Sequence, residues 1–233
     1  MTKAAKITIQ DVLIKSPNLF LGFMFFAVGI LLTRDAGIGM APWGVFHVGM
    51  SNYFPVTMGQ ATQLMGLLIL TVAFFLGQIP GLASIMNMVF IGMFIDILDS
   101  LVDIPTPEHF LVSVVMILIG VFFIGWGTYF YLRVKLGAGP RDGLMEGLVR
   151  KTKRPVWLIR GIIEGSALFL GFLMGGPVGF GTLLIALTLG FSVEFAFKVG
   201  GYDSIAARHL DLKELWGKYQ GTENPLQYER KVS

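Results

Sequence analysis

Long apolar stretches, separated by short polar segments, dominate the chain. No Asp, Glu, Lys or Arg occurs in residues 16–33, 36–95, 110–132 or 165–193. A helix of about 18 or more such residues can cross the hydrocarbon layer of a bilayer, which is roughly 30 Å thick. Gly- and Pro-rich turns divide these stretches into six predicted spans. These spans are Leu19–Leu32, Met58–Leu76, Leu82–Leu98, Phe110–Tyr131, Val156–Met174 and Val178–Phe197. The fold class predicted is therefore an all-α integral membrane protein with six transmembrane helices.

Composition supports this fold class and narrows the function. The 233 residues are 54% hydrophobic and 14% charged, whereas a soluble domain carries about 25% charged residues. There is no cysteine, which excludes disulfides and thiolate chemistry. The three histidines, at positions 47, 109 and 209, lie far apart in the sequence, so no metal site is expected. No cofactor motif and no catalytic constellation is present, and the prediction is that the chain is not an enzyme.

Basic residues predict the orientation of the six spans. Segment 133–154 contains seven Lys and Arg, whereas loop 99–109 contains none. Positive loops stay on the cytoplasmic side. With six spans, both termini and segment 133–154 share that side and carry 16 of the 18 basic residues. Because these residues flank apolar helices and form no basic face, nucleic acid is not an expected partner.

The sequence repeats itself at an offset of 98 residues. Shifting it by this amount aligns 19–97 with 117–195 without a gap and places seven glycines on glycines; about two such matches are expected by chance. Each half contains three spans, an odd number, so the second half enters the membrane from the opposite face. The predicted parts are an N-terminal cytoplasmic segment 1–18, a first repeat 19–98, an external loop 99–109, an inverted second repeat 110–198 and a cytoplasmic polar tail 199–233. Inverted three-helix repeats are typical of secondary transporters.

Several motifs resemble those of a known family. In the first half they are Met40-Ala41-Pro42-Trp43 and the turn 77–81; in the second half they are residues 136–143, Arg160, Glu164 and the turn 175–182. Over residues 19–198 the chain resembles the YczE/YyaS/YitT family of bacterial integral membrane proteins. The resemblance implies a protein of the bacterial cytoplasmic (inner) membrane. The chain departs from the family pattern at Gly44, where an acidic residue is usual, and at 83–84, where Gly-Thr is usual.

Charged residues within a span mark the first candidate site. Arg160 and Glu164 are four residues apart in the fifth span, on one helix face. Charges at this depth are costly and usually face the interior of the bundle. Glu164 could be a gating or coupling carboxylate, or the two side chains could form a structural ion pair.

Two prolines mark the second candidate site. Pro42, with Trp43, and Pro140, with Arg141 and Asp142, each open a short helical segment. The start of a half-helix could meet an anion. The alternative is a helix lying on the membrane surface, which the charge pattern favours for the second segment. For the first segment, dipping into the membrane and lying on it are equally consistent with the sequence.

Uncharged polar residues in the second and third spans complete the candidates. Gln60, Gln63 and Asn87 could hydrogen-bond between helices, the favoured interpretation, or line a cavity. Two function hypotheses follow: a secondary transporter or exporter of a small solute, and a non-transporting accessory or scaffold protein. The expected partners are membrane lipids, a small molecule of unknown identity and, as an open option, further copies of the chain.

Overall fold

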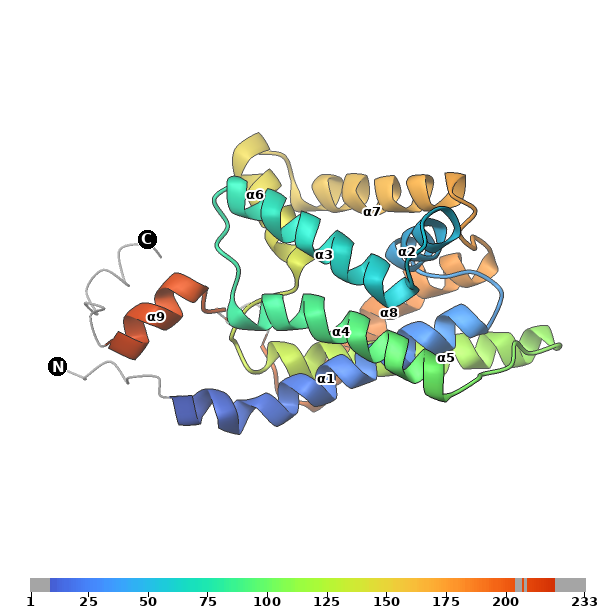
Figure 1. Cartoon of the computed structure of the whole chain (residues 1–233), viewed down its shortest axis with the longest axis horizontal. Helices are drawn as coiled ribbons and strands as arrows, with labels where there is room; N and C mark the ends of the chain where they lie inside the picture. The colour runs from blue at the N-terminus through green and yellow to red at the C-terminus, as the bar shows by residue number, and fades with distance from the viewer. Residues whose placement is uncertain (1–8, 204–206, 208, 221–233) are drawn as a thin grey trace.

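The computed structural model describes residues 9–203, 207 and 209–220, and all regular structure in this part of the chain is helical (Figure 1). The helices are α1 (Ile9–Asp35), α2 (Pro42–Tyr53), α3 (Met58–Phe75), α4 (Leu82–Leu101), α5 (Phe110–Leu132), α6 (Pro140–Thr152), α7 (Val156–Leu173), α8 (Phe180–Val199) and α9 (Leu212–Gln220). Six of the helices in the described residues, α1, α3, α4, α5, α7 and α8, are long and apolar enough to cross a membrane. The six predicted spans are confirmed.

Helix α1 begins well before the predicted first span. Pro17 lies inside it and has no backbone N–H to donate to the carbonyl of Leu13. The hydroxyl of Ser16 donates to that carbonyl instead, at 2.8 Å. The helix therefore continues through the proline, and the predicted boundary at residue 18 falls within it.

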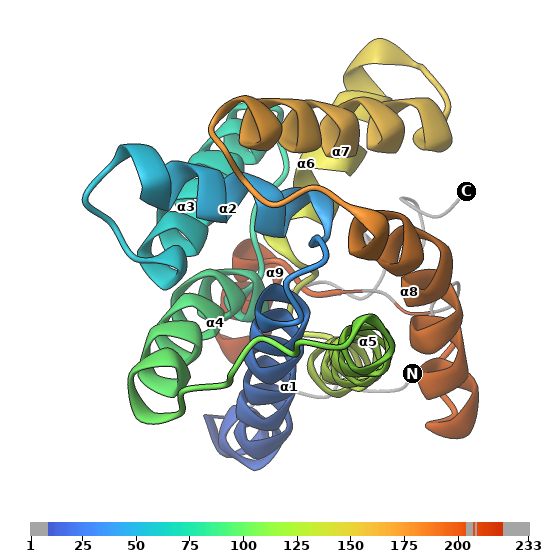
Figure 2. The ribbon, with the colours of Figure 1, turned by 90° about the vertical axis from the view of Figure 1, so that its right-hand side faces the viewer.

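Helices α1 and α5 pack against each other along one side of the bundle, between α4 and α8 (Figure 2). Their backbones approach closely at two glycine contacts. A Cβ added to Gly29 would lie 2.5 Å from the carbonyl oxygen of Gly120, and one added to Gly22 would lie 2.9 Å from that of Gly127. Such contacts let two helices pack at close range in a membrane, where small residues are enriched at interfaces.

The other long helices pack unevenly on this pair and on one another. Helix α4 packs on α1 and α8 packs on α5, while α3 packs on α4. Helix α7 does not pack on α8 in the same way: it contacts α2 instead and stands apart from α8 (Figure 2). The hairpin α3–α4 is thus closed, whereas the hairpin α7–α8 is open.

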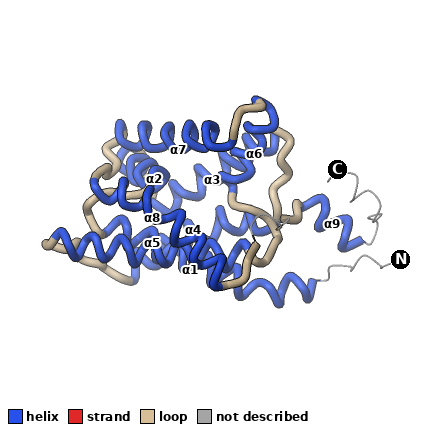
Figure 3. The backbone as a smooth tube through the Cα atoms, turned by 180° about the vertical axis from the view of Figure 1, so that it is seen from behind, coloured by secondary structure: helices blue, strands red, loops and turns tan. Residues whose placement is uncertain are grey.

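The two short helices lie toward opposite ends of the bundle. Helix α6 lies toward the end that holds α9 and the start of α1, and α2 lies toward the other end (Figure 1). The loops also gather at these two ends, as the view from behind shows (Figure 3). Helix α6 packs on α3, and α2 packs on α7, so each short helix lies against a long helix of the other half.

Candidate functional site

Helices α2 and α6 meet at their first turns, inside the bundle. The guanidinium carbon of Arg141 lies 4.5 Å from the centre of the Trp43 ring. Trp43 is only 6% exposed, and its indole Nε1 donates a hydrogen bond to Glu164 Oε1 at 3.1 Å. Glu164 is near the middle of α7. The residues that follow the two prolines are therefore brought together at mid-depth in the bundle.

Both short helices then run outward to an edge of the bundle. At the end of α2, the side-chain amide of Asn52 donates to the carbonyls of Met174 and Gly175, at 3.4 and 3.2 Å. At the end of α6, Arg150 donates to the carbonyls of Leu76 and Gly77, at 3.2 and 3.0 Å. In the first turn of α6, Pro140 is buried and Asp142 is exposed, and Arg150 at the outer end is exposed. The interpretation favoured for α6, a helix lying on the membrane surface, stays a prediction.

Four ionisable side chains gather around this meeting point. Arg141 interacts electrostatically with Asp142, Glu164 and Arg160. No ion pair within 4.0 Å joins any two of them in the residues that the structure describes. The predicted structural pair of Arg160 with Glu164 is not formed: Arg160 is exposed, while Glu164 is bonded to Trp43.

Asp142 lies at the start of its own helix. It is the acidic residue in the first turn of α6, and a carboxylate oxygen lies close to Gly139, the residue that precedes the helix. A negative charge at this place complements the helix dipole. The hydroxyl of Tyr131, which is 5% exposed, also reaches Gly139. The sequence interpretation missed Tyr131 because an aromatic residue at the end of an apolar span carries no pattern of its own.

His47 is a second residue that sequence reasoning missed. It is 3% exposed, and its Nδ1 shares a hydrogen bond of 3.0 Å with Thr62 Oγ1, which joins α2 to α3. Its spacing of four residues from Trp43 places both on the buried face of α2. This spacing could have indicated His47 from the sequence, but only if α2 were already known to lie inside the bundle.

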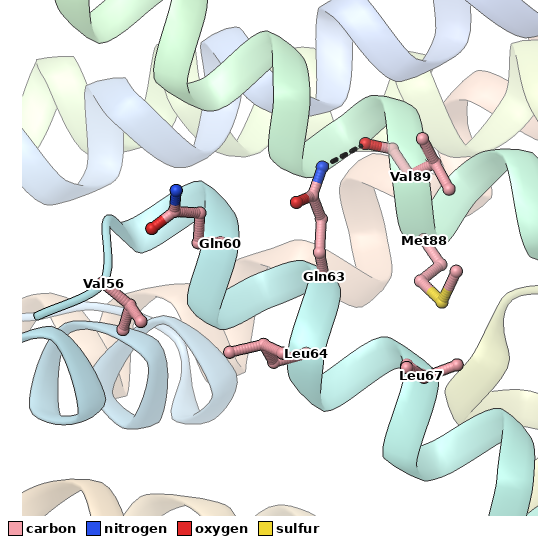
Figure 4. Close-up of a pocket in the computed structure, with 7 residues that line it drawn as sticks. All are labelled: Val56, Gln60, Gln63, Leu64, Leu67, Met88 and Val89. Atoms are coloured by element: carbon pink, nitrogen blue, oxygen red, sulfur yellow. Dashed lines mark hydrogen bonds between the residues drawn. The ribbon is translucent and has the colours of Figure 1, made fainter. Parts of the chain in front are cut away.

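The predicted polar candidates of α3 and α4 lie elsewhere. Gln60 closes a capping box with Thr57 at the start of α3, and the amide of Gln63 donates to the Val89 carbonyl at 2.9 Å. Both line a shallow groove between α3 and α4, about 370 Å³ in volume (Figure 4). Its other lining residues are Val56, Leu64, Leu67, Met88 and Val89. Since Leu64 and Leu67 are about half exposed, at 51% and 54%, this groove lies on the outer surface.

Asn87 and the acidic residues of α4 also stand outside the central group. Asn87 is half-buried, and the structure gives it no hydrogen bond among the described residues. Asp96 accepts from the Gly59 backbone N–H at 2.9 Å and from the Thr57 hydroxyl at 2.6 Å. Asp99 pairs with Arg34 at 2.5 Å. No group of three or more His, Cys, Asp or Glu residues in the described part of the chain could hold a metal ion.

The comparisons with known proteins decide the family. Residues 14–198 match the model of a family of unknown function, DUF6198. The chain belongs to this family. It is 34% identical over 189 residues to the uncharacterized membrane protein YczE of Bacillus subtilis, which covers 80% of the chain and 87% of YczE. An uncharacterized Haemophilus influenzae protein is 33% identical over 184 residues, 77% of the chain and 84% of that protein.

The chain is also similar to a second Bacillus subtilis protein. The uncharacterized protein YyaS of Bacillus subtilis is 29% identical over 166 residues, which cover 70% of the chain and 83% of YyaS. No solved structure matches the chain. The resemblance inferred from the motifs is confirmed: the chain is a multi-pass membrane protein similar to YczE and YyaS.

Proposed function

We propose that the chain is a secondary transporter or exporter of a small solute, built from two inverted three-helix halves. In this proposal it lies in the bacterial cytoplasmic (inner) membrane with both termini in the cytoplasm, and it moves the solute without covalent chemistry. The observation that carries the proposal is the unequal state of its two hairpins, α3–α4 closed and α7–α8 open, in halves whose other contacts correspond. Alternating access in inverted repeats uses two such unequal states that exchange.

Corresponding backbone hydrogen bonds support the inverted repeat. The N–H of Ala83 donates to the carbonyl of Leu136 at 2.8 Å, and the N–H of Gly181 donates to that of Ile38 at 2.7 Å. At the offset of 98, Ala83 corresponds to Gly181 and Leu136 corresponds to Ile38, so the two bonds are equivalent in the two halves. The same exchange converts the bonds of Asn52 on the end of α7 into those of Arg150 on the end of α3.

Further support comes from the contact between α1 and α5 and from the first turns of α2 and α6. The close contact of Gly22 with Gly127 corresponds, at the same offset, to that of Gly29 with Gly120. Trp43 corresponds to Arg141, and these two side chains stack on each other. The approximate twofold axis of the proposed repeat would therefore pass between α1 and α5 and between the first turns of α2 and α6. A solute site at this place would be shared by both halves.

In the closed hairpin, the start of α3 is held against the end of α4. A Cβ on Gly92 would lie 2.5 Å from the Gly59 carbonyl oxygen, and Asp96 accepts two hydrogen bonds from the start of α3. At the offset of 98, Gly92 corresponds to Gly190, which has nothing within 4 Å of an added Cβ. Asp96 corresponds to Glu194, which instead pairs with Lys198 of its own helix at 2.8 Å. In the proposed orientation, α3–α4 closes the external side and α7–α8 opens to the cytoplasm.

Cysteine cross-linking tests the exchange of the two states. The protein contains no cysteine, so pairs can be introduced directly. We expect Gln63→Cys with Val89→Cys, which lie in contact, to form a disulfide in membrane vesicles under mild oxidation. The corresponding pair, Gly161→Cys with Leu187→Cys, should cross-link in the opposite state, because a disulfide requires Cα atoms within about 7 Å.

The expected result is that locking one pair prevents the other from reacting. If the first pair always reacts and the second never does, the halves do not exchange states. The alternative of a non-transporting accessory protein would then replace the transporter proposal. Gly165→Cys with Leu187→Cys, a pair that is one turn further along α7, serves as the control for nonspecific reaction.

Impermeant thiol labelling tests the proposed orientation. In intact cells we expect Asp103→Cys to be labelled, because it lies in the predicted external loop. Lys151→Cys should be labelled only after permeabilisation, because it belongs to the basic segment held on the cytoplasmic side. Both side chains are exposed in the structure, so protection reports the membrane barrier. The reverse labelling pattern would contradict the proposed orientation.

A further inference from the structure

We infer that the central site binds a small monovalent carboxylate, held by Arg141 at the uncapped start of α2. The inference rests on the proposed function for its biological use, although it concerns binding alone. Its starting point is the guanidinium of Arg141. Protein atoms surround this residue at depth, while part of its side chain stays accessible, as expected for a group that lines an internal opening.

The hydrogen-bond donors of Arg141 lack acceptors. A guanidinium carries five N–H donors in a fixed fork. In the described residues it makes no hydrogen bond and no ion pair within 4.0 Å; its close contact is the stacking on the Trp43 ring. That contact uses the flat face of the guanidinium and leaves the edges, which carry the donors, available. None of these nitrogens is both fully buried and unpaired, so a ligand can reach them, and a carboxylate fits this fork with two parallel hydrogen bonds.

The start of α2 provides a second set of donors beside Arg141. Its N-cap, Ala41, makes no side-chain hydrogen bond, and the first turn has no acidic residue. The N-cap of α6, Gly139, also makes no side-chain hydrogen bond, but an acidic residue, Asp142, lies in the first turn of that helix. At the offset of 98, Gly44 corresponds to Asp142. Helix α2 therefore has no acidic residue at the position that Asp142 holds in α6, and an external anion can complement the positive end of this helix.

The charges of the site select a monovalent anion. Arg141 and Arg160 supply two positive charges, and Asp142 and Glu164 supply two negative charges. The starts of α2 and α6, which meet here, each add roughly half a positive charge, so the excess is about one unit. One carboxylate compensates this excess, whereas a divalent phosphate or sulfate would leave the site strongly negative next to Glu164. A cation is disfavoured, because Arg141 and the start of α2 are both positive and Glu164 already accepts from Trp43.

Binding of acetate to the purified full-length protein tests this inference. Thermal unfolding is measured in detergent with sodium acetate, sodium chloride, sodium sulfate and methylammonium chloride, at constant ionic strength. We expect a saturable rise in Tm with acetate alone, since a ligand that binds the folded state stabilises it. Arg141→Gln should weaken acetate binding by about 30-fold or more. Arg133→Gln is the matched control, because Arg133 also stacks on an aromatic ring, that of Tyr129, at 5.1 Å, and is exposed.

Each outcome decides the inference. Equal effects of acetate and chloride on the unmodified protein, or full affinity in Arg141→Gln, would overturn it. If Arg141→Gln does not fold, Arg141→Lys decides, since it keeps the charge but loses the fork and should bind acetate several-fold more weakly. Acetate binding with no exchange between the two cysteine pairs would retain the site and overturn transport. Exchange between the two cysteine pairs without acetate binding would retain the transport proposal and overturn the carboxylate site.

Discussion

Replacing Gly29 with leucine should abolish the recovery of folded protein. Gly29 lies where α1 crosses α5, and its Cβ would lie 2.5 Å from the backbone oxygen of Gly120 and 2.6 Å from Ile124 Cγ1. A backbone oxygen held in a helix cannot give way, so the two helices would have to separate. Overpacking of this kind costs about 3 kcal/mol, and thermal unfolding with size-exclusion chromatography in detergent would measure it.

The matched control is Gly165→Leu on α7. Nothing lies within 4 Å of a Cβ added there, so the free energy of unfolding should change by less than about 0.5 kcal/mol. Both substitutions add the same side chain to an apolar helix, and they differ in what the side chain meets. Equal yields and equal Tm values for the two variants would contradict the close crossing of α1 and α5.

Glu164→Gln should leave the protein folded but remove most of its transport. Glutamine keeps an oxygen that can accept from Trp43 Nε1, which Glu164 now does at 3.1 Å. Arg160 loses no partner, because it is exposed and is not paired with Glu164. The stability cost should therefore stay below about 1 kcal/mol. Loss of the charge next to Arg141 should slow solute flux by at least roughly tenfold, equivalent to about 1.4 kcal/mol.

Two companion variants separate the charge of Glu164 from its hydrogen bond. Trp43→Phe removes the indole donor but keeps an aromatic face for Arg141, so it should lower stability more than flux. Glu164→Leu removes both the charge and the acceptor and should lower both. Flux into proteoliposomes and thermal unfolding are measured on the same preparations. Unchanged flux in Glu164→Gln would remove this carboxylate from the transport mechanism and leave it a structural role at Trp43.

The long helices could be predicted from sequence because the bilayer imposes a length and a composition on them. The turns 77–81 and 175–179 were visible as Gly and Pro clusters, and the observed helices α3, α4, α7 and α8 end or begin beside them. The start of α1 was missed because the prediction followed the apolar run from Leu19, whereas the helix begins at Ile9 and continues through Pro17. Its continuation depends on a hydroxyl of Ser16 that replaces the missing donor, and a hydropathy pattern does not contain this detail.

The site was predictable in its parts and not in its arrangement. Pro42 and Pro140 were identified as helix starts, and both are. The spacing of Arg160 and Glu164 allowed an ion pair, but spacing along one helix cannot reveal a competing partner from another helix. Trp43, 121 residues away in the chain, is that partner. Gln60 and Gln63 were candidates only because polar groups within a span are rare, and the structure uses them at a helix start and between helices.

The caps at the outer ends of α2 and α6 differ in one respect that concerns the origin of the chain. Asn52 and Arg150 occupy corresponding positions and each holds the last carbonyls of a helix in the other half. Under the proposed duplication, either side chain satisfies the same carbonyls, so the ancestral unit could exchange one for the other without losing its fold. Only the arginine, however, carries the positive charge that is retained on the cytoplasmic side during membrane insertion. One ancestral position would thus serve two purposes. Both Asn52 and Arg150 cap a helix end, and Arg150 in addition keeps its end of the chain on the cytoplasmic face of the membrane.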